Sequence, residues 1–464
     1  MDRIFTFPGG TMSRRNRLNF RAAWALSGVL LCLIAPVPAR TQQEAPSDAL
    51  RLTLEEAVAY ARGHNPMVLA ARQEVEARRG QHREAASLFW PDLTFTETYS
   101  RTTNPVYVFM GKLNQERFGM MDFALPNLNR PAPLNNYQSR AELTAPLFAG
   151  GKIKAAYRAS RLGVEAASSQ SVFAESSLTK AVTEAFLGSL LAGRAAEVMA
   201  ETVGTAEAHL RQVEAMHGQG LILDSDLLRM RVFVSDMRQQ RAAREADAKV
   251  ARAYLAYAMG HDGEVEPVGE LSGEGEAPPS LQEALEAALS GREDLRAAEL
   301  QSRQASEGVK MARADYLPQV GAVAAYEQDT ESWSGHGDNW MVGIQLRLPL
   351  FDGGARSGRL LTARSREFQA RQALLDLQRK VRVEVREAWL RLEAASERVS
   401  VSSESEAQAR ENLRIVELRY KEGMASITDL LDADTALTAS ALQRAQAVHD
   451  ERVARARLQW AMGK

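Results

Sequence analysis

The sequence predicts a mainly α-helical chain that also carries four amphipathic β-strands, assembled as two copies of one unit. Three observations favour this fold class. Two helical patterns run far beyond the length of a globular helix. Alternating apolar and polar residues stand directly before two related motifs, PLFAGG at 146–151 and PLFDGG at 349–354. The same order of elements then returns at a constant spacing, as expected of an internal duplication.

Residues 1–39 predict an export signal. Arginines between positions 14 and 21 precede an apolar run over 22–35, and small residues close the segment, so cleavage is expected after Ala39. A membrane anchor is the alternative interpretation. A spanning helix needs about 20 apolar residues, and because this run is shorter we expect removal on export.

Composition excludes several classes of protein. The 464 residues are 45% hydrophobic and 25% charged with a net charge of −2, which offers no basic field for a nucleic acid. The single cysteine, Cys32, lies inside the predicted signal, so the processed chain has no disulfide and no cysteine metal site. No apolar run of spanning length follows Ala39. If the processed chain enters a membrane, it must do so with strands.

The two halves of the processed chain align without a gap over a long stretch. Pro146 corresponds to Pro349 at the same spacing that relates Gly220 to Gly423. We therefore expect a first repeat, a linker rich in glycine, glutamate and proline, and a second repeat, over 40–260, 261–279 and 280–464.

Each repeat is expected to hold three helices. They cover 54–89, 152–217 and 226–259 in the first repeat, and 281–316, 354–422 and 429–462 in the second. The middle helix of each set is about 100 Å long at 1.5 Å per residue, and the other two are about half that length. Each long helix should therefore lie beside two short helices stacked end to end, in a layer four helices wide.

Four strands are expected, paired as two antiparallel hairpins. They cover 93–99, 137–148, 320–326 and 340–350, with loops over 100–136 and 327–339. Each strand has one apolar and one polar face. Two hairpins packed on a soluble core are one interpretation. Lengths close to the 9–11 residues of a membrane strand, with aromatic residues at the strand ends, favour a barrel in a membrane.

A sheet of four strands has two open edges, which hydrocarbon does not tolerate. The chain is therefore expected to oligomerise. Two copies would supply about eight strands around a filled interior, and three would supply about twelve around a lumen. A conduit would need three copies.

The turns after the long helices carry the candidate functional residues. Each long helix stops at a glycine suited to a left-handed cap, Gly220 or Gly423. Asp226 and Asp429 follow at the start of the return helices. They could simply cap those helices, because free N–H groups and the helix dipole favour a carboxylate there. They could also form a gate, since carboxylates repeated around a narrow end make a ring of negative charge.

The chain resembles the TolC-like outer-membrane efflux proteins. The resemblance covers about Leu52 to Gly463 and is carried by the paired PLFAGG and PLFDGG motifs and by the turns HGQGLILDSDL and YKEGMASITDLLDA. It implies a homotrimer with a shared twelve-stranded barrel in the Gram-negative outer membrane, in contact with its lipid, and a coiled-coil helical barrel in the periplasm. It also implies a periplasmic adaptor, an inner-membrane pump reached through that adaptor, and no cofactor or catalysis.

The same resemblance assigns roles to individual residues. It implies a periplasmic gate made by Asp226, Tyr420, Asp429 and Asp432. It implies adaptor docking at the tips through Gly220, Leu221, Gly423 and Met424, for which ordinary turn chemistry is the simpler interpretation. A gate arginine of the family falls at Ala425, so that contact is expected to be missing.

Two other functions compete with an export channel. An enzyme is disfavoured because the seven histidines are scattered and no nucleophile, phosphate-binding or metal motif is present. A structural coiled-coil protein of the envelope, such as an adhesin without a lumen, explains the long helices equally well. Four amphipathic strands favour the channel, because a stalk has no use for them.

Overall fold

The computed structural model describes residues 49–271, 278–332 and 337–464. The predicted signal over 1–39, with Cys32, lies outside the described residues, as does part of the predicted linker. In the first half of the chain the elements are β1 (Leu50–Leu52), α2 (Leu54–His64), α3 (Pro66–Ser87), β2 (Asp92–Thr102), α4 (Pro105–Asn114), η2 (Met120–Phe123), α5 (Leu125–Asn129), β3 (Leu134–Phe148), α6 (Lys152–Gly218), α7 (Asp224–Met259) and β4 (Val265–Pro267). In the second half they are α8 (Leu281–Gly291), α9 (Glu293–Ala314), β5 (Gln319–Thr330), β6 (Asp338–Arg347), α10 (Ala355–Lys421) and α11 (Ile427–Ala461).

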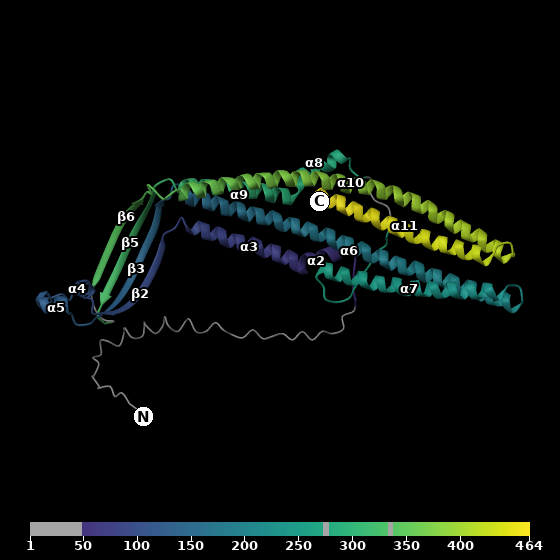
Figure 1. Ribbon diagram of the computed structural model, residues 1–464, viewed down its shortest axis with the longest axis horizontal. Coiled ribbons are helices and arrows are strands. Elements are labelled where there is room, and N and C mark those ends of the chain that lie inside the picture. The colour runs from purple at the N-terminus through teal and green to yellow at the C-terminus, as the bar shows by residue number, and fades with distance from the viewer. Residues whose placement is uncertain (1–48, 272–277, 333–336) are drawn as a thin grey trace, which may run out of the picture. The chain divides into compact units, whose positions relative to one another are not determined.

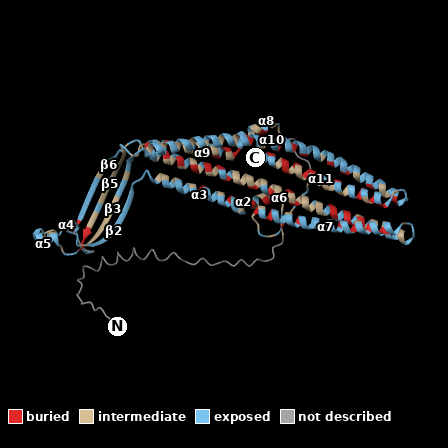
Figure 2. Cartoon of the chain, viewed as in Figure 1, coloured by how far each residue is buried: buried red, intermediate tan, exposed pale blue. Residues whose placement is uncertain are grey.

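The four long strands form one antiparallel sheet in the order β2-β3-β5-β6 (Figure 1). Each strand is connected to a helix of the bundle, as β3 is to α6 and β6 to α10. Strands β2 and β6 form the two edges and are exposed along almost their whole length (Figure 2).

The register places mostly polar side chains on one face of the sheet and mostly apolar side chains on the other. One row across the four strands is polar and consists of Thr96, Arg140, Glu327 and Asn339. The next row points to the other face and is mostly apolar, with Phe95, Ala141, Tyr326 and Trp340. This alternation follows from the two-residue period of a strand.

The double glycines turn the chain from strand into helix. Gly151 and Gly354 have φ values of 83° and 91° and precede the first residues of α6 and α10. At Gly150 a Cβ atom would lie 2.8 Å from the Cβ of Leu317, so this turn also needs the space that glycine leaves. The two helices that follow have 67 residues each, which corresponds to about 100 Å.

The helices pack side by side (Figure 1). Helix α6 contacts α3 along its first part and α7 along its second, while α10 contacts α9 and then α11. Contacts between α6 and both α9 and α11 join the two sets. Buried apolar residues line these contacts, as the red segments of Figure 2 show.

Two predicted helices are each divided in two, so those predictions were wrong. The helix expected over 54–89 is broken at Asn65, whose extended backbone ends α2 while its side chain accepts from Met67 N–H to begin α3. Pro66 enforces this break because the residue before a proline disfavours helical angles. The helix expected over 281–316 is broken at Arg292, also extended.

Two further expectations need correction. The loop expected over 100–136 contains α4, η2 and α5 as well as the ends of both strands. The return helices begin at Asp224 and Ile427, two residues earlier than expected. Strands β1 and β4 form a small parallel sheet that the sequence did not predict, and it anchors the start of the linker. In the described part of the chain, no helix is both long enough and apolar enough to cross a membrane.

Candidate gate at the helical tips

Both turns at the far ends of α6 and α10 are closed by the same backbone motif. Gly220 N–H donates to His217 C=O at 2.8 Å and Leu221 N–H to Met216 C=O at 3.0 Å. Gly423 and Met424 make the matching pair of bonds to Tyr420 and Arg419. The two glycines have φ values of 72° and 73°, the left-handed geometry that this cap requires.

Asp429 caps its own helix, although not at the position expected. The N-cap residue is Ser426, and Asp429 stands three residues later. One carboxylate oxygen of Asp429 accepts from both the backbone N–H and the hydroxyl of Ser426 at 2.8 Å. The backbone bond from Ser426, followed by the bond from its hydroxyl, lowers the pKa of Asp429. The side chain is therefore held as an anion on the tip surface.

Asp226 and Tyr420 are brought close together from two different helical hairpins, α6–α7 and α10–α11. Asp226 lies in the first turn of α7, whose N-cap, Leu223, makes no side-chain bond. Tyr420 lies in the last turn of α10 and is 7% exposed. Burial raises the pKa of Tyr420, and the negative charge of Asp226 raises it further. No hydrogen bond joins the two residues among those the structure describes, and the Tyr420 hydroxyl lacks a partner there.

Asp432 is exposed on α11, one turn after Asp429. Among the described residues it makes no hydrogen bond or ion pair. Its carboxylate is therefore exposed to solvent, where its negative charge can attract cations beside the tip. Ala425 is half-buried against the core between the hairpins.

A buried polar cluster that the sequence did not single out lies just behind the tip. Asp434 on α11 is 3% exposed, and its Oδ2 has no hydrogen-bond partner in the described chain. Burial, together with the charge of Glu417, raises the pKa of Asp434 to about 6. His209 on α6 faces Glu417 at 3.6 Å between Nε2 and Oε1, and burial lowers the pKa of His209.

The sequence does contain a signal for Asp434. It occupies the third place in the series Ile427, Leu430, Asp434 and Leu437, whose spacing puts all four on one face of α11. The other three are apolar and pack in the core shared by the two hairpins. A second residue that sequence reasoning missed is Arg229, which donates to Thr428 Oγ at 2.9 Å and links α7 to α11.

The tips also expose apolar side chains. Leu221 is 64% exposed, Leu223 70% and Met424 59%, all in or beside the turns. No described group of three histidine, aspartate, glutamate or cysteine side chains is arranged to hold a metal ion. Each tip therefore combines exposed carboxylates with exposed apolar side chains, at the end of the helices farthest from the sheet.

Comparison with known proteins gives a consistent result. The family model for outer membrane efflux proteins matches residues 58–261 and 284–464. The outer membrane efflux protein BepC of Brucella suis is 30% identical over 180 residues, which are 38% of this chain and 40% of that relative. The chain thus aligns with less than half the length of this relative.

Solved structures of similar fold cover nearly the whole chain. The outer membrane protein VceC of Vibrio cholerae has a TM-score of 0.74 at 18% identity, covering 88% of this chain and 96% of that one. The CmeC outer membrane channel of Campylobacter jejuni has a TM-score of 0.76 at 16% identity, covering 92% and 90%. At these identities the likeness shows the fold alone.

The resemblance predicted from the paired motifs is therefore confirmed, and so is the mainly helical fold class. The matched regions include the long helices and both tips. The chain belongs to the outer membrane efflux protein family.

Proposed function

We propose that the chain is the outer-membrane exit duct of a tripartite export system, a homotrimer gated at its periplasmic tips. The observation that carries this proposal is the sheet. One face is polar and the other carries large exposed apolar residues, including Phe95 at 68%, Trp340 at 76% and Ile344 at 74%. A sheet with this polarity and two unpaired edges suits a barrel wall between lipid and water.

The helices have matching open edges. Helix α10 exposes apolar residues at close to seven-residue spacing on the face opposite its buried one, namely Leu361, Phe368, Leu375, Val383 and Leu390. Helix α7 exposes apolar residues in two groups towards its two ends, namely Leu228 and Val232, and Val250, Tyr254 and Tyr257. Stripes of this kind mark helix–helix contacts, so α10 of one copy is placed against α3 and α7 of the next.

Three copies give about twelve strands, enough to surround a lumen, whereas about eight would be filled by side chains. In this arrangement the two repeats of each chain contribute equivalent hairpins to the sheet and equivalent helical tips to the other end. The long helices extend into the periplasm as a continuation of the barrel. A structural coiled-coil protein without a lumen is the second candidate, and the two-faced sheet disfavours it.

Under this proposal the tips form the gate. Asp429 and Asp432, repeated around the axis, make a ring of negative charge that favours cations. The charge of Asp226 already acts on Tyr420, and a shift of the helical hairpins towards each other would let the tyrosine hydroxyl donate to that carboxylate. With alanine at 425 instead of a family arginine, closure rests on these contacts and on the core between the hairpins.

The tips are also the proposed docking surface for a periplasmic adaptor, which would connect the duct to an inner-membrane pump. Leu221 and Met424 follow the cap glycines Gly220 and Gly423, so the fixed turns present them outward. Apolar side chains held on rigid turns suit recognition by another protein.

Ion selectivity in planar bilayers tests the channel and its gate together. Purified wild-type protein should conduct and favour cations. Asp432→Asn should reduce that preference without altering the fold, because the residue is exposed and unpaired in the described chain. Asp247→Asn, an equally charge-neutralising change on the exposed side of α7, should leave selectivity unchanged. Absence of conductance would contradict the channel, and unchanged selectivity in Asp432→Asn would contradict the gate.

A further inference from the structure

The segment between β2 and β3 is a folded unit rather than a loose loop. The rings of Phe109 and Phe118 meet at 4.7 Å, and those of Phe118 and Phe123 at 5.0 Å. Lys112 and Asp122 form an ion pair of 2.6 Å across the same unit. It lies at the end of the sheet opposite the long helices (Figure 1).

This unit is fastened to the polar face of the sheet. The buried side chain of Gln115 donates to Asn135 C=O at 2.8 Å and to Asn136 Oδ1 at 2.7 Å. The register places Asn136 on the same face as Arg140 and Glu327. Asp329, on that face, is only 1% exposed. Helix α4 therefore covers the outer end of the face proposed to line the lumen.

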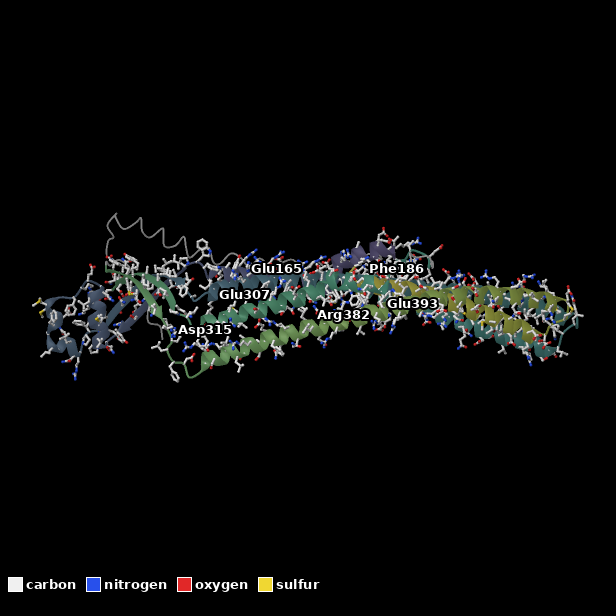
Figure 3. The ribbon with its side chains drawn as sticks, turned by 90° about the horizontal axis from the view of Figure 1, so that it is seen from above. Glu165, Phe186, Glu307, Asp315, Arg382 and Glu393 are labelled. Atoms are coloured by element: carbon white, nitrogen blue, oxygen red, sulfur yellow. The ribbon has the colours of Figure 1, made fainter. Side chains whose placement is uncertain are left out.

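Its opposite side is apolar and uncovered. Val106, Met110 and Leu113 follow one another at helical spacing and are 67%, 50% and 43% exposed. Met120 and Leu125, the first residues of η2 and α5, are 86% and 73% exposed. Figure 3 shows side chains, with sulfur atoms among them, projecting from this end of the chain. Soluble surfaces seldom gather so many large apolar residues, and such a patch marks an interaction site.

Charge disfavours a lipid headgroup as the partner. Of the three cations between β2 and β3, Lys112 is paired with Asp122 and Arg117 with Glu331. Phosphate recognition needs free cations, which this surface largely lacks. An apolar surface with its charges paired is instead complementary to a second surface of the same kind.

We propose that the segments between β2 and β3 of neighbouring copies pack on one another and form an apolar constriction over the outer mouth of the barrel. The contact would be made by Val106, Met110, Leu113, Met120, Met121 and Leu125. The proposal rests on the assembled channel proposed above, because only a closed barrel turns the polar faces inward and brings several of these segments over one lumen. An apolar constriction opposes the passage of ions by excluding water. The duct then has a second barrier, at the end opposite the acidic tips.

Crosslinking tests the contact directly. The predicted processed chain has no cysteine, so Met121→Cys introduces a single thiol into the patch, where Met121 is 78% exposed. A short bismaleimide added to the purified assembly should yield covalently linked chains on denaturing gels. Arg101→Cys is the matched control, because it is exposed at the same end of the sheet but on the apolar face. It should stay unlinked.

The oligomeric state of the untreated protein separates two kinds of failure. A monomer would overturn the proposed channel itself. An intact oligomer in which Met121→Cys crosslinks no better than Arg101→Cys would overturn only the proposed contact between the β2–β3 segments of neighbouring copies.

Conductance tests the barrier. The variant Met120→Ser/Met121→Ser/Leu125→Ser should raise single-channel conductance above wild type in planar bilayers, since polar side chains hold water in the constriction. The control variant Val268→Ser/Leu289→Ser makes the same chemical change on exposed residues away from the outer mouth and the helical tips, and it should conduct as wild type does. Conductance unchanged in the first variant would contradict an apolar barrier even if crosslinking succeeds.

Discussion

Asp434 places a titratable group inside an apolar core. The helical period of α11 puts it in line with Ile427 and Leu430, which are 4% and 1% exposed. A carboxylate in such a site loses its hydration and here gains no hydrogen bond at Oδ2. The folded protein therefore holds the proton of Asp434 more tightly than the unfolded chain does, with a pKa of about 6 against an ordinary value of 3.8.

The sign of the pH dependence follows from that shift. Protonation of Asp434 favours the folded tip at pH 4, and this favourable contribution is lost as the pH rises towards and through about 6. Asp434→Asn mimics the protonated form at every pH. We expect it to stabilise the protein by about 3 kcal/mol at pH 7.5, from roughly 1.4 kcal/mol for each unit of pKa shift, and by close to nothing at pH 4. Thermal melting at the two pH values measures the difference.

His209 does not confuse this comparison. Burial lowers the pKa of His209, so protonation of this residue reduces the stability of the folded protein as the pH falls below the ordinary pKa of histidine. Because that effect is present in wild type and in Asp434→Asn alike, it cancels in the difference between them. Asp432→Asn, two positions away and exposed, should melt as wild type does at both pH values. A destabilised Asp434→Asn at pH 7.5 would contradict an uncompensated buried charge.

At the scale of elements, the two return helices begin differently. Helix α11 starts with Ser426 and a full set of capping bonds. Helix α7 is preceded by Leu223, which has the extended backbone of an N-cap but no side-chain acceptor and is 70% exposed. One hairpin is therefore closed by a capped helix and the other by an uncapped one.

Exchanging these caps should change the stability of the two tips in opposite directions. Leu223→Ser should stabilise the start of α7, and Ser426→Ala should destabilise the start of α11, each by about 1 kcal/mol. Hydrogen exchange of amides in the first turns of α7 and α11 should slow in the first variant and quicken in the second. Equal exchange in both variants would mean that tertiary packing, rather than capping, holds these turns.

The element scale also shows what sequence patterns can and cannot predict. The strands and the long helices were predictable because their two faces meet different surroundings. Apolar residues therefore recur with a period of two in the strands and 3.6 in the helices. The break before Pro66 was readable from the proline but was not predicted. Strands β1 and β4 have three residues each, too few for any period to appear.

The candidate site was predictable to a smaller extent. Glycine at 220 and 423 follows from the turn geometry, which local sequence dictates. The position of Asp429 in a capping box required the correct helix start, which lies two residues earlier than its pattern indicated. The cluster of His209, Glu417 and Asp434 comes from three helices, so only the packing of α6, α10 and α11 brings it together.

At the scale of the whole molecule, a single chain leaves apolar surface uncovered on both flanks. On the sheet these flanks are β2 and β6, and on the helices they are α3 with α7 on one side and α10 on the other. Edge strand β6 continues into α10, which carries an exposed apolar stripe, and edge strand β2 follows α3, which lies on the same flank as α7. A copy of the chain placed on one flank would therefore cover strand edge and helix stripe together.

The stripe on α10 gives the most direct test of that assembly. Phe368 is 64% exposed and lies seven residues from both Leu361 and Leu375. In the proposed trimer Phe368→Glu would bury a charge between copies, so we expect the variant to shift the purified protein from that trimer to a monomer, because an unpaired buried charge costs several kcal/mol. Gln369→Glu adds the same charge to the next exposed position, off the stripe, and should stay trimeric. Native mass measurement in detergent distinguishes the outcomes. A Phe368→Glu protein that remains trimeric would place the contact between copies elsewhere on the chain.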